Sequence, residues 1–489
     1  MKYSETMELI ELPYEIIEMI FDYVLCNDLK NLIRINSRIR EIIITSPRQM
    51  RKLRLVLWEN WRSRVPFIEE YGMNVKELIF DHTNFDKPNE FKELMKLMRS
   101  IENIKLNNVH IKAENIAKKY KVLSMKFSKI KKLDMDNSKA TPKILNLYLK
   151  KLQIQELKLD FSHYNTTSSF TEFFCNQKHL KTLTLSGFEN VMYKSLFSDD
   201  ISECVQFQLN HLIINHRIAP NTSFLNFLKM QKTLEKLEVH KEINITEFFN
   251  VVFEMSSIAS LTLQTNFVTL KNINFKKISN SMISELILFT KKQYGIEQTI
   301  NFLVTKLQNL QILKIINSKT DSSDQLLGFV HLKKLKHLHI ENSKLKFIQN
   351  INFSCLKSIH LCKIYPFLKF EDWKNLLKNN TGIEEIKLSE IECYYVIESI
   401  KTEIDNIIYN LHYLKFVKVF ELYQELRYQK PIKVVMRTSG NFKKMQVSDS
   451  FIKICRDEFH LLRKINSNLV QDLSYFADEN LYVNNKYLK

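Results

Sequence analysis

Residues 154–159 read IQELKL and residues 180–185 read LKTLTL, with apolar side chains in the first, fourth and sixth places of each stretch. The last three places alternate apolar and polar, as in a strand that buries one face. A helix does not keep all three apolar places on one stripe. Each stretch therefore predicts a short, half-buried strand.

The same pattern recurs along most of the chain. It starts at Val75, Ile101, Ile130, Ile154, Leu180, Leu209, Leu234, Ile258, Ile283, Leu310, Leu335, Leu356, Ile383 and Leu414. The intervals between these starts average about 26 residues. Regular spacing of this kind is typical of repeat proteins, whose units bury their apolar faces only by stacking.

Between the predicted strands lie segments with helical spacing of apolar residues, such as 91–98, 224–228 and 248–253. Thr222 and Thr246 precede two of them, where a side-chain oxygen can cap the first free backbone donors. Each repeat is therefore expected to be a strand, a turn and a helix. The fold class is α/β, with strand leucines and helix aromatics sharing one core.

Residues 75–424 resemble a leucine-rich-repeat domain of the helix-containing class. In that family the ninth position is usually Asn or Cys and ties down the turn backbone. Here the position holds one asparagine and several serines: Asn266, Ser138, Ser162, Ser318 and Ser343. The resemblance implies a curved solenoid over 75–424. The ladder of ninth-position residues is degenerate in this chain, because asparagine is mostly replaced there. Residues 425–489 lose the pattern and are expected to form a C-terminal cap with a helix near 451–465.

Residues 12–24 read LPYEIIEMIFDYV, and two further short apolar stretches follow before residue 46. Pro13 suits the first turn of a helix, where its missing N–H costs nothing. Asn27 or Asp28 suits the cap of a second helix, and Ser37 suits the cap of a third. A helical module this small seldom buries enough surface to be stable alone, so a partner or the adjacent repeats must cover it.

This module resembles an F-box, and we place it at residues 8–50 with a helical linker or N-terminal cap at 51–74. The matching residues are Leu12, Pro13, Glu15, Ile16, Ile17, Ile20, Phe21, Tyr23, Asp28, Leu29, Leu32, Ile35 and Arg38. Ile39 stands where the family has a tryptophan, and Asn36 and Ser37 replace its cysteine and lysine.

The F-box resemblance implies docking on the small adaptor subunit of SCF-type cullin–RING ubiquitin ligases and, through it, to cullin. The implied docking residues are Leu12, Pro13, Ile16, Ile17, Ile20, Phe21, Tyr23, Leu29, Leu32 and Ile35. The sequence does not separate residues that contact the partner from residues that form the module's own core.

Signs of catalysis or of a cofactor are absent from the sequence. The six glycines are too scattered for a GxGxxG or Walker-type phosphate loop, and no GxSxG or HExxH motif occurs. No CxxC framework predicts a metal site. The seven cysteines are scattered and odd in number, which predicts reduced thiols in the cytoplasm or nucleus. Neither a secretory signal nor a membrane span is expected.

The predicted concave face carries one middle residue per strand. The column reads Ile79, Lys105, Asp134, Lys158, Thr184, Ile213, Glu238, Thr262, Ile287, Lys314, His339, His360, Lys387 and Lys418. From Lys314 onward it holds only lysine and histidine. The candidate substrate-binding residues are Ile287, Phe289, Lys314, Ile316, His339, His360, Lys387 and Lys418. An acidic or phosphorylated peptide would suit this row.

The sequence thus predicts a non-catalytic adaptor that brings a protein substrate to a ubiquitin ligase. Two alternatives stay open: a repeat scaffold unconnected to ubiquitin, whose N-terminal helices only cap the first repeat, and a nucleic-acid-binding solenoid that uses the net charge of +18. An AT-rich coding sequence would also explain the many lysines, and the basic column lacks interleaved aromatic residues, which argues against nucleic acid.

Overall fold

The structure is a computed structural model. It describes residues 9–24, 32, 35–50, 54–85, 94, 96–98, 100–111, 130–136, 152–160, 171–187, 204–215, 222–242, 246–265, 282–290, 296–316, 329, 331–341, 352–363, 370–389, 419–426, 429–439 and 442–447. The chain divides into two compact units, Met1–Leu234 and Glu235–Lys489, and each is a stack of parallel strands with helices on one side.

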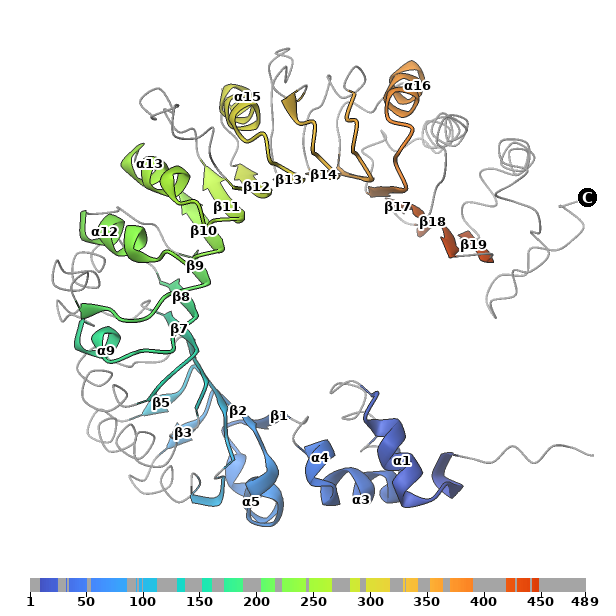
Figure 1. Cartoon of the computed structure of the whole chain (residues 1–489). Coiled ribbons are helices and arrows are strands. Elements are labelled where there is room, and N and C mark those ends of the chain that lie inside the picture. Colours follow the sequence, from blue (N-terminus) through green and yellow to red (C-terminus); the bar gives the residue numbers. More distant parts are fainter. Residues whose placement is uncertain are drawn as a thin grey trace, which may run out of the picture. The chain divides into compact units, whose positions relative to one another are not determined.

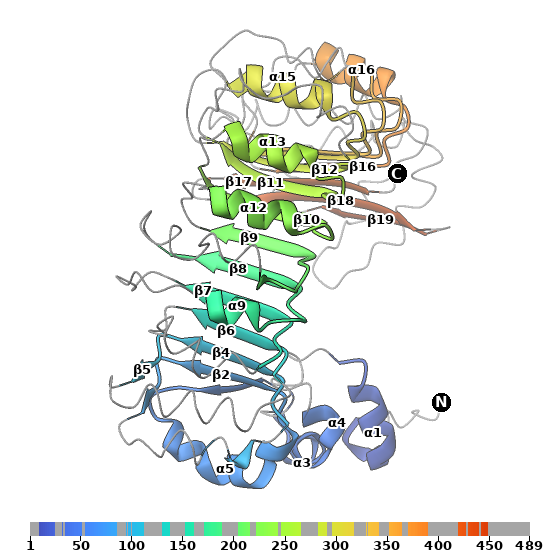
Figure 2. The same cartoon turned by 60° about the vertical axis from the view of Figure 1, so that its left-hand side comes forward.

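The first unit contains a parallel sheet whose strands follow one another in chain order (Figure 2). These strands are β1 (Arg54–Leu57), β2 (Glu77–Asp81), β4 (Asn103–Asn107), β6 (Lys132–Asp136), β7 (Glu156–Asp160), β8 (Thr182–Ser186) and β9 (His211–Asn215). A separate parallel pair joins β3 (Asn84–Phe85) to β5 (His110–Ile111).

The predicted strand motif is confirmed by burial. In β8, Leu183 and Leu185 are fully buried while Thr182, Thr184 and Ser186 are half-buried on the other face. Leu183 pairs in register with its equivalents Leu157 and Leu212 on the neighbouring strands. Equivalent leucines therefore stack into continuous buried rows, as expected when repeats share one core.

The helices of the first unit are α1 (Tyr14–Phe21), α3 (Ser37–Thr45), α4 (Pro47–Met50), α5 (Val65–Tyr71), α9 (Thr171–Cys175) and α12 (Thr222–Met230). Phenylalanines from α9, α12 and the segment before β9 meet behind the sheet. Phe174 and Phe207 have ring centroids 6.1 Å apart, and Phe207 lies 6.2 Å from Phe227. These buried aromatics link successive repeats, as the sequence predicted.

The sheet begins earlier than the first predicted motif at Val75. Strand β1 lies within the segment expected to be a helical linker, and Leu55 and Leu57 pair with Leu78 and Phe80. The six-residue motif is incomplete at this strand, because Lys52 occupies the place that an apolar residue fills in later repeats. Residues 51–74 thus supply a strand as well as helix α5.

The second unit has parallel strands from β10 to β17. They are β10 (Lys236–Glu242), β11 (Ser260–Thr265), β12 (Glu285–Thr290), β13 (Ile312–Ile316), β14 (His337–Glu341), β15 (Ser358–Cys362), β16 (Glu385–Ser389) and β17 (Val419–Leu426). Helices α13 (Thr246–Glu254), α15 (Ile296–Lys306) and α16 (Phe370–Asn379) lie on one side of this sheet (Figure 1).

The end of the second sheet differs from the expected helical cap. Strands β18 (Gln429–Ser439) and β19 (Phe442–Val447) extend the sheet, and both pair antiparallel with their neighbours. Antiparallel neighbours can follow each other through short turns, whereas parallel repeats need a crossover. The predicted helix near 451–465 lies outside the described residues.

Buried amide side chains tie neighbouring repeats together. Oε1 of Gln231 accepts a hydrogen bond of 2.8 Å from the backbone N–H of Leu209, and Oδ1 of Asn380 accepts one of 2.6 Å from Phe353. Gln177 does the same for Ile154 at 3.2 Å. These residues lie just after the helices, whereas the ladder residues predicted from the family pattern (Ser138, Ser162, Asn266, Ser318 and Ser343) lie outside the described residues.

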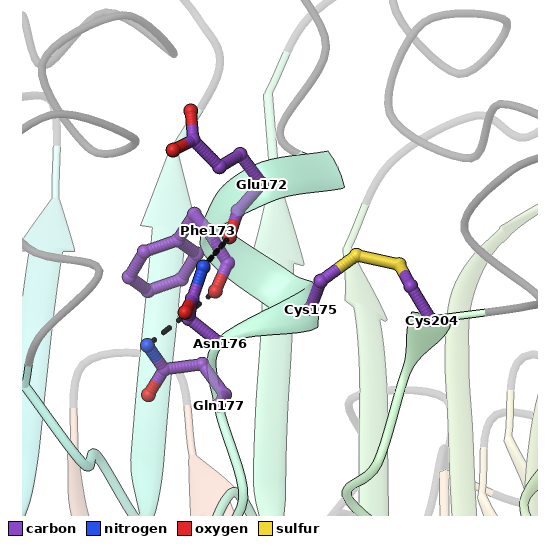
Figure 3. Close-up of a disulfide and its surroundings, with 6 residues drawn as sticks. All are labelled: Glu172, Phe173, Cys175, Asn176, Gln177 and Cys204. Carbon is purple, nitrogen blue, oxygen red and sulfur yellow. Dashed lines mark hydrogen bonds between the residues drawn. A yellow bond between two sulfur atoms is a disulfide. The ribbon is translucent and has the colours of Figure 1, made fainter.

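Two of the cysteines form a disulfide, which corrects the expectation of reduced thiols. Cys175 at the end of α9 bonds to Cys204 near the start of the segment leading to β9 (Figure 3). Their Cα atoms are 5.0 Å apart, and the two residues have a sequence separation of 29. That separation is about one repeat, so stacking of the repeats brings the two cysteines together. No short-spacing cysteine motif in the sequence predicts this pairing. Cys355 is an exposed free thiol.

Candidate protein-recognition surface

The N-terminal helices form a small packed module. Ile17 and Phe21 of α1 and Ile39, Ile42 and Ile43 of α3 are buried, and α1 contacts α3. Asn36 caps α3, with Oδ1 accepting hydrogen bonds from the N–H groups of the next turn, so the cap lies one residue before the expected Ser37. Most of the predicted second helix falls outside the described residues.

Polar contacts hold α1 against α4. Arg48 forms an ion pair of 2.8 Å with Asp22, and Nε2 of Gln49 donates to Asp22 at 3.0 Å. Gln49 Nε2 also donates to the backbone carbonyl of Glu18 at 3.2 Å. Together with the buried isoleucines, these contacts give α1 one fixed orientation and leave its other face to solvent.

The structure divides the predicted docking residues into core and surface. Ile17 and Phe21 are core residues. Exposed residues include Pro13, Ile16 (42%), Ile20 (37%), Tyr23 (89%) and Ile35 (73%). Leu12 and Leu32 are half-buried, and Leu29 lies outside the described residues.

Three further exposed apolar residues in this module were not predicted: Leu9 (37%), Tyr14 (38%) and Met19 (59%). Ile16, Met19, Ile20 and Tyr23 recur at helical spacing of three and four, so they share one face at and just beyond the C-terminal half of α1. Met19 could have been predicted from this second apolar stripe of α1, which lies beside the stripe that packs on α3.

The open face of the first sheet is charge-balanced. Asp134 on β6 lies 3.6 Å from Lys105 on β4 and 3.8 Å from Lys158 on β7. At the edge of the sheet, hydrogen bonds from Lys131 and Lys76 lower the pKa of Glu102 from 4.5 to about 2. Positive middle-column residues of this unit thus have an acidic neighbour across the strands.

The middle column of the second sheet follows the predicted order up to Lys387. Ile287, Lys314, His339, His360 and Lys387 pair in register on five successive strands. Each is half-buried on the face that carries no helix. The structure therefore brings together these predicted substrate-binding residues from segments spread over about 100 positions of sequence.

Lys418 was wrongly placed in this column. The partner of Lys387 on β17 is Glu421, and Lys418 lies outside the described residues. The sequence around β17 fits the repeat motif in two ways, starting at Leu414 or at Val417, and the sheet uses the second, with Phe420 and Leu422 in register with Ile386 and Leu388. The column thus ends in an acidic residue.

A pocket of about 370 Å³ opens over β13 to β16. Its polar lining comes from Lys314, His337, His339, Ser358, His360, Glu385 and Lys387. Ile312, Leu338 and Ile359 complete the lining. Four of the predicted residues, Lys314, His339, His360 and Lys387, therefore line one cavity.

Two of the histidines that line this pocket lie side by side. The rings of His339 and His360 have centroids 4.1 Å apart and planes inclined by 34°. Nε2 of His339 is buried and has no hydrogen-bond partner among the described residues; Oε2 of Glu341 lies 3.7 Å away. Burial, His360 and Lys314 lower the pKa of His339 from 6.5 to about 4. His339 is therefore neutral at neutral pH.

Glutamates flank the pocket lysines. Nζ of Lys387 lies 2.6 Å from Glu385, and Nζ of Lys314 lies 3.8 Å from Glu285. Lys314 and Lys387 are each about two-fifths exposed, at 38%. Solvent screening keeps each pair weak, so both lysines retain the freedom to contact a ligand.

An apolar patch borders the pocket on β12 and β13. It consists of Ile287, Phe289, Ile312 and Ile316, all half-buried on the open face, and Phe289 pairs with Ile316 in register. His240 contacts the ring of Phe289, with centroids 5.8 Å apart. Both predicted features, a basic row and an apolar neighbour, lie side by side on this sheet.

We expect the stability of the second unit to fall as pH falls from about 6.5 to about 4, because unfolding restores the ordinary pKa of His339 and the unfolded chain binds more protons in this range. The side chain is 23% exposed, so we expect a loss on the order of 2 kcal/mol. His339→Gln should remove this component in denaturant titrations across that range.

The exposed His331 offers a matched control, because His331→Gln also removes one histidine from the same unit. It should leave the pH dependence of the wild type in place. Equal curves for the wild type and His339→Gln would contradict the assignment of this effect to His339.

Comparisons with known proteins concern the fold alone. No protein-family model matches the sequence, and no curated protein matches it. TLR13 in the TLR13–ssRNA13 complex aligns with a TM-score of 0.40 and 17% identity, covering 78% of this chain and 56% of TLR13. An internalin (inlF) from Listeria monocytogenes aligns with a TM-score of 0.35 and 13% identity, covering 81% of this chain and 96% of the internalin.

This chain spans about half the length of the TLR13 chain. The fold assignment rests on its own parallel ladders and on the repeat length of about 26 residues. The fold is a leucine-rich-repeat-like α/β solenoid. In such repeats, equivalent residues of successive strands line up in columns across the open face of the sheet. The open face therefore forms a continuous surface suited to recognition.

Two further observations concern the described residues alone. No helix among them is long and apolar enough to cross a membrane. No group of three or more His, Cys, Asp or Glu side chains in the described part of the chain is placed to hold a metal ion, and the pocket histidines belong to no such group.

Proposed function

We propose that this protein is a non-catalytic adaptor of an SCF-type ubiquitin ligase. Its N-terminal module docks on the small adaptor subunit of the ligase, and its repeats bind a protein substrate. The observation that carries the docking half is the exposed apolar face of α1 with Ile16, Met19, Ile20 and Tyr23. Clustered exposed apolar side chains of this kind mark interaction sites.

The resemblance of residues 12–38 to an F-box supplies the identity of the proposed partner. The repeat half of the proposal is supported by the open face of the second sheet, where polar, charged and apolar residues from successive strands are combined on one surface. Adaptors act by bringing a substrate close to a catalytic subunit, and this role needs no reactive group of their own. The proposed compartment is the cytoplasm or nucleus.

The test is a binding titration of the full chain with the purified adaptor subunit. We expect Ile16→Asp combined with Ile20→Asp to weaken binding by at least about 100-fold, because each change places a charge where an apolar contact is buried. Both side chains are exposed in the free chain, so the variant should fold. Phe21→Ala is less informative, because Phe21 belongs to the module's own core.

Arg40→Asp is the matched control for this titration. Arg40 is exposed on α3, and its replacement changes the net charge by the same amount as the two isoleucine substitutions. It should bind like the wild type. Absence of binding by a folded wild-type chain would rule out the adaptor role, and equal binding by the double variant would rule out the α1 face.

The Cys175–Cys204 disulfide favours a second candidate function. Stable disulfides persist in oxidising compartments and are rare in the cytosol. A leucine-rich-repeat recognition protein unconnected to ubiquitin, with N-terminal helices that cover the first repeat, would accommodate this bond. Thiol trapping during cell lysis separates the two: reduced Cys175 and Cys204 agree with the ligase adaptor, and an oxidised pair agrees with the second candidate.

A further inference from the structure

The fixed charges around the second-unit pocket nearly cancel. Lys314 and Lys387 are offset by Glu285 and Glu385, which pair with them, and Glu341 lies 3.7 Å from His339. With neutral histidines, the site has no net attraction for an anion. Its positive character therefore depends on the histidines.

Three histidines, His337, His339 and His360, line this pocket. His339 and His360 stack at 4.1 Å, and Nδ1 of His337 lies 2.8 Å from Oγ of Ser358 on the next strand. An anion bound in the pocket beside Lys314 and Lys387 would place a negative charge near His339, whose buried Nε2 lacks a hydrogen-bond partner among the described residues. It would also offset the cost of a second positive charge beside Lys314.

The apolar patch fixes where a second anchor of the same ligand would lie. The pocket centre lies between β14 and β15, and the patch spans β12 and β13, two strand spacings or about 10 Å away. An extended peptide advances about 3.3 Å per residue. A segment crossing the strands thus reaches the patch three or four residues after the pocket.

We propose that this surface binds an extended acidic protein segment, placing a carboxylate or phosphate in the pocket together with a proton taken up by the histidines. An apolar side chain three or four residues away packs on Ile287, Phe289, Ile312 and Ile316. The inference rests on the proposed role of the repeats in substrate binding and does not depend on docking by the N-terminal module.

Proton uptake gives the interaction a pH dependence of known sign. The charged and titratable groups that face His339 are Lys314 on β13, His337 and Glu341 on its own strand, and His360 on β15, with Lys387 and Glu385 on β16 across the pocket. A bound anion raises the pKa of His339, so binding should strengthen as pH falls. Each unit of that rise adds up to about tenfold in affinity.

The probe is an oriented peptide array with a central cysteic acid, phosphoserine, glutamate or glutamine and one leucine moved through a glycine–serine background. Cysteic acid carries a sulfonate that stays ionised, so its pH dependence reports the protein. We expect the three anions to bind and glutamine not to bind, with leucine selected three or four residues from the centre. The phosphoserine and glutamate arms decide which anion is preferred.

Affinity for the best cysteic acid peptide is then measured by fluorescence anisotropy with the full chain. We expect about a tenfold gain between about pH 7.5 and about pH 5.5 for the wild type and a smaller gain for His339→Gln. Lys314→Gln combined with Lys387→Gln should lose about tenfold or more, and Phe289→Ser should lose the leucine preference. Lys105→Gln, at the same column position in the first unit, should change nothing.

Three results would overturn the inference: equal binding of the glutamine peptides, a pH-independent affinity for the sulfonate, or an equal loss in Lys105→Gln. Competition by a single-stranded RNA oligonucleotide with the same variant pattern would assign the surface to nucleic acid instead. Failure here leaves ligase-adaptor binding untouched, and failure of adaptor binding leaves the peptide result intact, so the two proposals are tested separately.

Discussion

Replacing Cys204 by serine is expected to lower the free energy of unfolding of the first unit by about 3–4 kcal/mol. The disulfide closes a loop with a sequence separation of 29, and cross-linking a loop of this length reduces the entropy of the unfolded chain. It joins α9 to the segment before β9, so its loss frees the connection between two repeats (Figure 3). Wild-type protein in reductant should behave like the variant.

Denaturant titration measures this change, and hydrogen exchange of the β8 and β9 amides localises it to the first unit. Cys355→Ser is the matched control, because Cys355 is an exposed free thiol. We expect it to stay within about 0.5 kcal/mol of the wild type. Equal stability of the wild type with and without reductant would contradict a stabilising disulfide.

The same bond links stability to the choice between the two candidate functions. In a reducing compartment the first unit loses this contribution and depends on its leucine rows, its phenylalanine layer and its buried amides. In an oxidising compartment it keeps the bond, but the proposed ubiquitin-ligase partner would be absent. Thiol trapping therefore bears on function as directly as the adaptor titration does.

Replacing Asn380 by leucine is expected to cost about 2–4 kcal/mol in the second unit. Asn380 is 3% exposed. Its Oδ1 accepts from the N–H of Phe353 at 2.6 Å, and its Nδ2 donates to the carbonyl of Leu376 at 2.7 Å. Leucine has a similar volume and no polar atoms, so the Phe353 N–H stays buried without this partner.

The neighbouring Asn379 provides the matched control, because it is exposed at the end of α16. Asn379→Leu should change the free energy of unfolding by no more than about 0.5 kcal/mol. Hydrogen exchange gives a local readout, since the Phe353 amide should lose protection in Asn380→Leu before the rest of β15 and β16 does. Unchanged protection would show that the amide ladder is not a stabilising contact between these repeats.

The middle column that crosses the candidate pocket could be predicted from sequence up to Lys387, whereas His337, Ser358 and Glu385 of the pocket lining were not predicted. The period-two alternation of each strand assigned Lys314, His339, His360 and Lys387 to one column, and parallel pairing in register confirmed it. The placement of Lys418 in the column was wrong because two overlapping motifs fit the sequence around β17. Pairing with β16 determines which of the two is used. A register is decided by the neighbouring strand, which a local pattern does not contain.

The predicted docking residues of α1 show the same limit of local sequence patterns, here on a helix. Sequence spacing placed Ile16, Ile17, Ile20 and Phe21 on the apolar side of one helix, and the packing of α3 and α4 decided that only Ile17 and Phe21 are buried. A helix with apolar residues on more than one stripe has two faces to offer, and only its neighbours determine which becomes core.

By itself the sequence determined the repeat length, the buried leucine rows and the position of the basic column, because each depends on the fixed periodicity of a strand. Tertiary structure alone decided the Cys175–Cys204 bond and the buried amides that join repeats. These contacts join residues about one repeat apart, and such residues become neighbours only when the repeats stack.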